Sequence, residues 1–169
     1  SDVLGSAKGW AGVFKYNKNA NKAIRNFYQR ENTLSLGVCN GCQLMMELDL
    51  LYPELKNNHP KMKMNKSEKF ECIFTSVDIL KNNSIMLNNL EGSTLGIWSA
   101  HGEGRFSFKN ESHNIVAKFH YKDYPSNPNG SEYSTAMLSS KNGRHLAMMP
   151  HLERSIFPWN WAHYEPSRK

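Results

Sequence analysis

The stretch 34–43 (LSLGVCNGCQ) constrains the fold of this chain more than any other, because it indicates a strand, a sharp turn and a helix in direct succession. Residues 33–38 before the turn are rich in β-branched and aliphatic side chains. From Cys42 onward, apolar residues recur at helical spacing up to the stop before Pro53. The turn itself holds Cys39, which is therefore a candidate nucleophile.

A thiol at this position faces the start of a helix, where unpaired N–H groups carry a partial positive charge. That charge favours the thiolate, which is the reactive form of cysteine. The backbone N–H of Asn40 could bind a developing oxyanion. Gly37 and Gly41 lie on either side of the turn, where glycine is expected to relieve the crowding of a strained nucleophile.

The segment 37–43 (GVCNGCQ) resembles the Gly-x-Cys-x-Gly-x-Gln elbow of class I (triad) glutamine amidotransferases. The segments 101–105 (HGEGR) and 149–154 (MPHLER) resemble parts of the same domain in a large ATP-dependent synthetase of purine biosynthesis. The resemblance implies an α/β fold, a flavodoxin-like open sheet with flanking helices, and one glutaminase domain over residues 1–169. It also implies an N-terminally incomplete domain, since 1–5 (SDVLG) resembles the tail of a glycine-rich loop that follows the first strands.

A base for Cys39 is predicted near the end of the chain. The strand expected at 145–149 ends at Pro150 and places His151 at its carboxyl end, where open α/β sheets bind their ligands. Glu153 follows two residues later and could hold the tautomer of the imidazole. A lone His-x-Glu is more often a surface or capping pair, but with the elbow and the resemblance we assign the catalytic roles to Cys39, His151 and Glu153.

The spacing Cys39-x-x-Cys42 has rival interpretations. It could be a redox pair or half of a zinc site, but a structural zinc site needs four ligands and only Cys72 remains besides scattered histidines. A redox pair leaves Gly41 and Gln43 without a role, whereas the elbow uses both. We therefore expect Cys42 to be a buried packing residue. By resemblance, Gln43 and the N–H of Asn40 bind the substrate, L-glutamine.

The function implied by the resemblance is hydrolysis of L-glutamine through a thioester on Cys39, with ammonia passed to the synthetase portion of a parent enzyme. ATP and Mg²⁺ belong to that portion, because this chain has no Gly-x-x-x-x-Gly-Lys-Ser/Thr loop and no evident carboxylate cluster for a metal. Two alternatives stay open. The chain could be a catalytically silent fragment that acts as an interaction module, or a cysteine hydrolase of the same fold with another substrate.

The bulk composition suits one domain of 169 residues, of which 39% are hydrophobic. The net charge of +6 is scattered and accompanies no nucleic-acid-binding motif, so we expect no nucleic-acid partner. No apolar run is long enough to cross a membrane. Three cysteines, one of them a candidate nucleophile, favour a reducing compartment, and we expect the cytoplasm.

The remaining elements are predicted from periodicity. Residues 1–16 are expected to be irregular and 20–30 helical. Strands are expected at 70–80, 96–100, 104–109 and 115–121, the last two as neighbours, with polar loops at 57–69 and 124–131. Phe70, Cys72 and Phe74 share one face of their strand, so Cys72 is expected to be structural.

Three further expectations concern segments near the predicted site. The loop that starts at His101 is expected to border the active site and to help couple it to the synthetase. Arg154 could pair with Glu153 or Glu103. The aromatic residues near the C-terminus are expected to serve packing or an interface, and these are Trp159, Trp161 and Tyr164.

Overall fold

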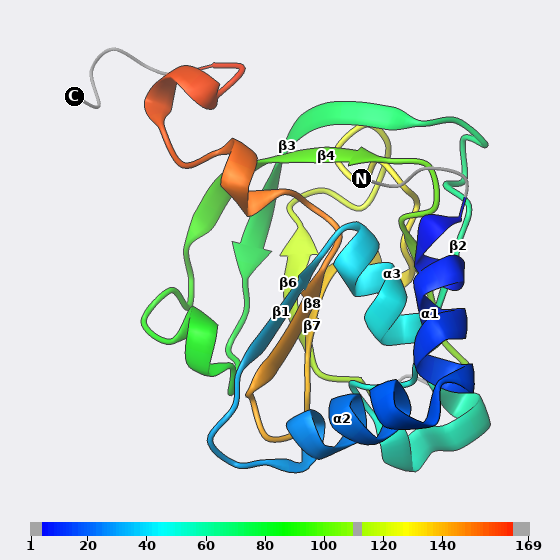
Figure 1. Ribbon diagram of the computed structural model, residues 1–169. Coiled ribbons are helices and arrows are strands. Elements are labelled where there is room, and N and C mark those ends of the chain that lie inside the picture. The colour runs from blue at the N-terminus through cyan, green and yellow to red at the C-terminus, as the bar shows by residue number, and fades with distance from the viewer. Residues whose placement is uncertain (1–4, 110–112, 164–169) are drawn as a thin grey trace.

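The computed structural model describes residues 5–109 and 113–163, and its main feature is a six-stranded sheet (Figure 1). The strands of the described residues are β1 (Ser35–Val38), β2 (Lys61–Lys63), β3 (Glu71–Ile79), β4 (Thr94–His101), β5 (Arg105–Ser107), β6 (Ile115–Phe119), β7 (Thr135–Ser139) and β8 (His145–Met148), and all but β2 and β5 belong to this sheet. The order in the sheet is β1-β8-β7-β6-β3-β4. The pair β1–β8 is parallel, and the other neighbouring pairs are antiparallel. The expected α/β open sheet with flanking helices is confirmed, and the sheet is mixed.

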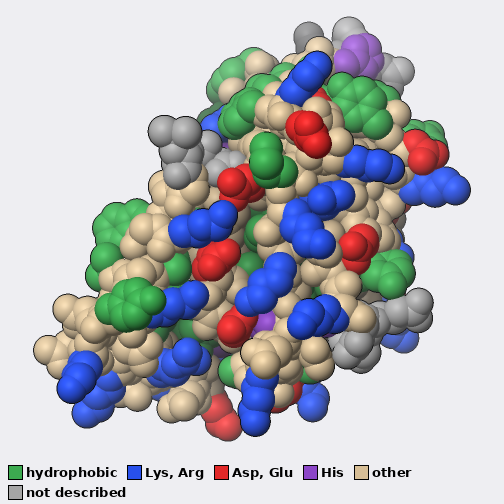
Figure 2. All heavy atoms as spheres, turned by 90° about the vertical axis from the view of Figure 1, so that its right-hand side faces the viewer, with side chains coloured by type: hydrophobic (Ala, Val, Ile, Leu, Met, Phe, Trp, Pro, Cys, Tyr) green, Lys and Arg blue, Asp and Glu red, His purple; other side chains and the backbone are tan. Residues whose placement is uncertain are grey.

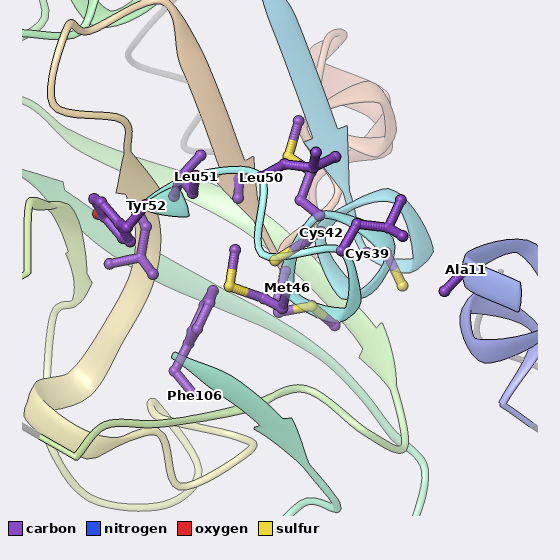
Figure 3. Packing of buried hydrophobic residues seen from close by; sticks show 13 residues of the cluster. Ala11, Cys39, Cys42, Met46, Leu50, Leu51, Tyr52 and Phe106 are labelled. Carbon is purple, nitrogen blue, oxygen red and sulfur yellow. The ribbon is translucent and has the colours of Figure 1, made fainter. Parts of the chain in front are cut away.

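Three α-helices lie together beside the β1–β8 part of the sheet (Figure 1). They are α1 (Ser6–Tyr16), α2 (Lys18–Gln29) and α3 (Asn40–Glu47). The core between them and the sheet contains the side chains of α3 and of the turn after it, together with Phe106 from β5 and Ala11 from α1 (Figure 3). This packing holds α3, and with it the turn at Cys39, against the sheet.

The N-terminal expectation is wrong for the described residues, because 6–16 form helix α1 instead of an irregular segment. Gly9 and Gly12 weaken the helical signal, since glycine is a poor helix former. The helix is stabilised by packing instead, with Ala7 and Ala11 at 3% and 1% exposure. Residues 1–4, which carry most of the expected glycine-rich loop, lie outside the described residues.

Short strands account for two further differences. The stretch 57–69, expected to be a loop, contains β2, which pairs with β5 in a separate two-stranded sheet. Strands β5 and β6 are therefore not neighbours as expected, since β6 lies in the main sheet between β7 and β3. Strand β7 was not predicted, although it is central and all five of its residues are buried.

The face of β3 that packs into the core is the opposite of the expected one. Val77 and Ile79 are buried, whereas Phe70 is 59% exposed and Cys72 is an exposed free thiol. Phe74 is the exception on the outer face, because its ring packs against those of Trp98 and Trp161. The prediction of a structural Cys72 is thus wrong.

Basic and acidic side chains are interleaved on the face formed by α1 and β2 (Figure 2). Three ion pairs connect neighbouring elements there: Lys8–Glu103 at 3.6 Å, Lys15–Glu47 at 3.9 Å and Lys61–Asp49 at 2.8 Å. Part of the positive charge of this face is therefore paired locally. Among the described residues, none of the helices is long and apolar enough to span a bilayer.

Candidate active site

The turn between β1 and α3 holds Cys39 in a strained conformation. Its φ of 51° and ψ of −106° lie outside the regions that a non-glycine residue normally occupies. Gly37 makes the turn possible, because an added Cβ would lie 2.6 Å from Sδ of Met45 and 2.8 Å from the backbone oxygen of Gly41. A Cβ at Gly41 would meet no described atom within 4 Å, so the expectation that Gly41 also relieves crowding is wrong.

Cys39 caps the N-terminus of α3 and lies at the carboxyl end of β1. Its N–H donates to the backbone oxygen of Met148 at 2.8 Å, which continues the pairing of β1 with β8. Its side chain is directed to β4, where Sγ lies 3.7 Å from the backbone oxygen of Ala100. The residue is 1% exposed. The predicted nucleophile is thus positioned by three elements and shielded from bulk water.

His151 and Glu153 form the predicted pair at the carboxyl end of β8. Nδ1 of His151 and Oε1 of Glu153 are 2.5 Å apart. Nε2 of His151 is buried and makes no hydrogen bond within the described part of the chain. The carboxylate therefore occupies one ring nitrogen and leaves the other for a reacting group. Nε of Arg154 lies 3.8 Å from Oε1 of Glu153, one of the two partners expected for it.

Strand β4 brings the two halves of this site together. The N–H of His151 donates to the backbone oxygen of Trp98 at 2.6 Å, and Sγ of Cys39 faces the oxygen of Ala100. Carbonyls two residues apart on a strand point to the same edge, so nucleophile and base lie along one edge of β4. Figure 1 shows β4 crossing above the carboxyl ends of β1 and β8. The sheet is curled so strongly that β4, at one edge, covers the elbow that follows β1, at the other edge.

The two predicted substrate-binding residues lie in the first turn of α3. Asn40 is the first residue of the helix, where backbone N–H groups have no intrahelical partner, and its Oδ1 accepts from Ser6 at 3.2 Å. Gln43 is 3% exposed, and its Nε2 donates to the backbone oxygen of Glu103 at 2.9 Å. Oε1 of Gln43 is buried and has no hydrogen-bond partner among the residues described.

The loop after β4 borders the site, as expected, and is fixed by Asn65, which sequence reasoning missed. Nδ2 of Asn65 donates to the oxygen of His101 at 2.7 Å, and Oδ1 accepts from the N–H of Gly104 at 3.0 Å. The N–H of Asn65 also donates to Gly102 at 2.8 Å. Asn65 lies in a lysine-rich polar stretch that gives no sequence signal for this role.

Cys42 is fully buried, which confirms the packing role predicted for it (Figure 3). Burial, and secondarily the neighbouring Cys39, raise the pKa of the Cys42 thiol well above its usual range. A redox pair or a zinc ligand requires an accessible thiolate, so this environment opposes both rival interpretations of the Cys-x-x-Cys spacing. In residues 5–109 and 113–163, no three His, Cys, Asp or Glu side chains gather as a possible metal site.

Relatives from several organisms carry the same enzyme name. A protein from Arabidopsis thaliana is 45% identical over 99% of this chain and is named probable phosphoribosylformylglycinamidine synthase, chloroplastic/mitochondrial. Proteins named phosphoribosylformylglycinamidine synthase from Dictyostelium discoideum and Homo sapiens are 43% and 38% identical over 95% and 98% of this chain. The matches span only 13%, 13% and 14% of these relatives, so the chain corresponds to a small part of them.

Solved structures agree with these relatives. PurLQS from Thermotoga maritima superposes with a TM-score of 0.67 at 26% identity, over 88% of this chain and 60% of that one. A glutamine amidotransferase from the same organism, 18% identical, gives a TM-score of 0.52 over 83% and 50% of the two chains and supports the fold alone. The model of the CobB/CobQ-like glutamine amidotransferase domain matches residues 1–169. The resemblance found in the elbow is confirmed, and the chain belongs to the family of CobB/CobQ-like glutamine amidotransferase domains.

Proposed function

We propose that this chain is the glutaminase domain of a phosphoribosylformylglycinamidine synthase of purine biosynthesis, and that it hydrolyses L-glutamine to glutamate and ammonia. One observation carries the proposal. A strained cysteine at a helix N-terminus and a buried His151, paired with Glu153, are both held against the same edge of β4. Nucleophile, base and orienting carboxylate are the parts that covalent acyl transfer needs.

In the proposed reaction, Nε2 of His151 takes the thiol proton of Cys39, and the sulfur attacks the γ-carboxamide carbon of glutamine. The oxyanion is stabilised by the N–H of Asn40 at the start of α3. His151 then gives its proton to the leaving nitrogen, and ammonia departs from a γ-glutamyl thioester. A water molecule deprotonated by His151 hydrolyses the thioester and regenerates the thiol. Glu153 keeps the proton of the imidazole on Nδ1 throughout.

Gln43 is proposed to bind the substrate beside the elbow. Its Nε2 is held by the backbone of Glu103, so its Oε1 is fixed in direction and accepts a hydrogen bond when a donor arrives. The α-ammonium group of glutamine is such a donor. The open space beside Gly41, where a Cβ would meet no described atom within 4 Å, leaves room for substrate next to the first turn of α3.

The ammonia is proposed to pass to the synthetase portion of the parent enzyme, which converts formylglycinamide ribonucleotide to formylglycinamidine ribonucleotide. ATP and Mg²⁺ are assigned to that portion. The partners of this domain are therefore L-glutamine and the rest of the same enzyme. A reducing compartment such as the cytoplasm suits an enzyme whose three cysteines are free thiols.

The test uses the full-length enzyme with Cys39→Ala. Glutamine-dependent synthesis should be abolished, because a methyl group cannot form the thioester, while synthesis from ammonium salts should persist. Cys42→Ala is the control and should retain glutamine-dependent synthesis. Undiminished use of glutamine by Cys39→Ala would make the domain a silent interaction module. Hydrolysis of other amides or esters, but not of glutamine, would identify a different cysteine hydrolase.

A further inference from the structure

We propose that Leu152, Ile156, Phe157 and Trp159 form a docking surface, here called the C-terminal apolar surface, for the synthetase portion of the same enzyme. This inference rests on the proposed function, because it takes the remainder of the parent enzyme as the occupant. The inference names the residues that make the contact and the connection between this surface and the catalytic pair, His151 and Glu153.

The four side chains are unusually exposed for their type. Leu152 is 40% exposed, Ile156 62%, Phe157 49% and Trp159 77%. The rings of Phe157 and Trp159 stack face to face, with centroids 4.6 Å apart and planes within 5°. Large apolar side chains clustered in one short exposed segment mark an interaction site, and aromatic residues dominate the binding energy of such sites.

Hydrogen bonds and aromatic contacts fix the backbone of the segment 155–161 against β3 and β4. The indole N–H of Trp98 donates to the backbone oxygen of Asn160 at 2.7 Å, and that of Trp161 donates to Ser155 at 2.9 Å. The ring of Phe74 lies between the two indoles, at 5.3 Å from Trp98 and 5.9 Å from Trp161. The sheet therefore fixes the backbone of the segment while its apolar side chains face outward. A preorganised surface loses little conformational entropy on binding.

This surface is continuous with the proposed catalytic pair. Leu152 lies between His151 and Glu153 in the chain. Trp98 connects the two regions directly, since its backbone oxygen accepts from the N–H of His151 and its indole bonds to Asn160. A body seated on the C-terminal apolar surface would therefore lie beside the site that releases ammonia.

The remainder of the parent enzyme suits this surface in size and in chemistry. The match to this chain spans only 13–14% of the length of the curated relatives, so most of such an enzyme lies outside the matched part. An apolar centre beside a charged rim, here Glu153 and Arg154, is the composition of a protein–protein interface. Figure 1 shows the segment after β8 projecting beyond β4, on the side away from α1, where a large body can approach it. A second copy of the enzyme is the competing occupant.

The direct test is hydroxyl-radical footprinting of the full-length enzyme, with oxidation of single side chains read by mass spectrometry. Trp159 should be strongly protected compared with Tyr16, an 87% exposed aromatic residue at the end of α1. Protection should not change with enzyme concentration. Trp159 oxidised as readily as Tyr16 would overturn the inference, and protection that disappears on dilution would assign the surface to a second copy and overturn it as well.

A second test removes the surface with Phe157→Ser and Trp159→Ser together in the full-length enzyme. Loss of an aromatic anchor should lower glutamine-dependent synthesis about 10- to 100-fold, and glutamate formed per product should rise above that of the unmodified enzyme. Synthesis from ammonium salts should persist, which shows that the synthetase is intact. Tyr16→Ser is the matched control, with no expected effect. An unchanged double variant would contradict the inference alone, whereas Cys39→Ala tests the proposed function separately.

Discussion

Sγ of Cys39 lies 3.7 Å from the backbone oxygen of Ala100 and donates toward it. A carbonyl oxygen accepts from a neutral thiol but repels a thiolate. The observed contact is therefore one that a neutral thiol can make, and in the proposed reaction the thiol proton passes from Sγ to Nε2 of His151.

Removal of the base should remove most of the activity. In the full-length enzyme, His151→Ala should lower glutamine-dependent turnover about 100- to 10,000-fold, the usual contribution of a positioned general base. Glu153→Ala should be less severe, because Glu153 acts by orienting the imidazole. The double variant should resemble His151→Ala. Steady-state kinetics of the three variants check this. If the free-energy loss of the double variant equalled the sum of the losses of the two single variants, the two residues would not act as a unit.

The two glycines of the elbow should behave differently. Gly37→Ala places a Cβ against the backbone of Gly41, which cannot move without shifting α3, and should destabilise the domain by roughly 1–3 kcal/mol. Gly41→Ala adds a methyl group to open space, so it should fold normally and interfere only with substrate. Chemical unfolding and glutamine kinetics of both variants measure this. Equal stability of the two variants would be inconsistent with the packing of the turn.

Asn65 is expected to be a positioning residue for glutamine. It holds the loop whose Glu103 carbonyl fixes Gln43, so Asn65→Ala should raise the KM for glutamine roughly tenfold and leave ammonia-dependent synthesis unchanged. Asn82→Ala is the control, because the Asn82 side chain likewise bonds the backbone, at the carbonyl of Leu80 and the N–H of Ser84, but outside the site. If both variants raised the KM for glutamine equally, the effect of Asn65→Ala would reflect a general loss of stability and not the positioning of Gln43.

A pH dependence of stability is expected from His145. It is 2% exposed, and burial lowers its pKa below the usual value of about 6.5. The folded state thus favours the neutral imidazole, and this contribution to stability is complete above about pH 6.5 and is lost as the pH falls toward the lower folded-state pKa. Urea unfolding between about pH 7.5 and pH 5 should show falling stability, with a smaller slope in His145→Gln. An unchanged slope in the variant would exclude His145 as the cause.

The parts of the molecule that the sequence predicted are those with a local signal. The elbow at Cys39 is recognisable because strand, glycine, nucleophile and helix follow one another within a few residues. His151 and Glu153 are predictable because a strand that ends just before Pro150 must deliver them to the carboxyl edge of the sheet. Their pairing needs only the two-residue spacing.

The parts that it did not predict depend on contacts between distant segments. The alternation of β3 allows either face to be buried. The face with Val77 is buried and the face with Cys72 is exposed because of the elements that pack on the sheet. The carbonyl of Ala100 reaches Cys39 only because the sheet curls, which no local pattern encodes. The glycines of α1 weaken its helical signal in the sequence. The five residues of β7 are all buried, so they show no alternation of polar and apolar residues that would mark a strand.

The central claim is that Cys39 is the nucleophile for glutamine, and the most direct measurement is peptide mass mapping of the full-length enzyme after treatment with a glutamine-like electrophile. We predict one adduct in this domain, on Cys39, that L-glutamine prevents from forming. Cys42 should stay unmodified because its thiol has a pKa raised well above the usual range by burial, and the exposed Cys72 should stay unmodified because it binds no glutamine. Labelling of Cys72 instead of Cys39, or labelling of Cys39 that L-glutamine does not slow, would contradict the claim.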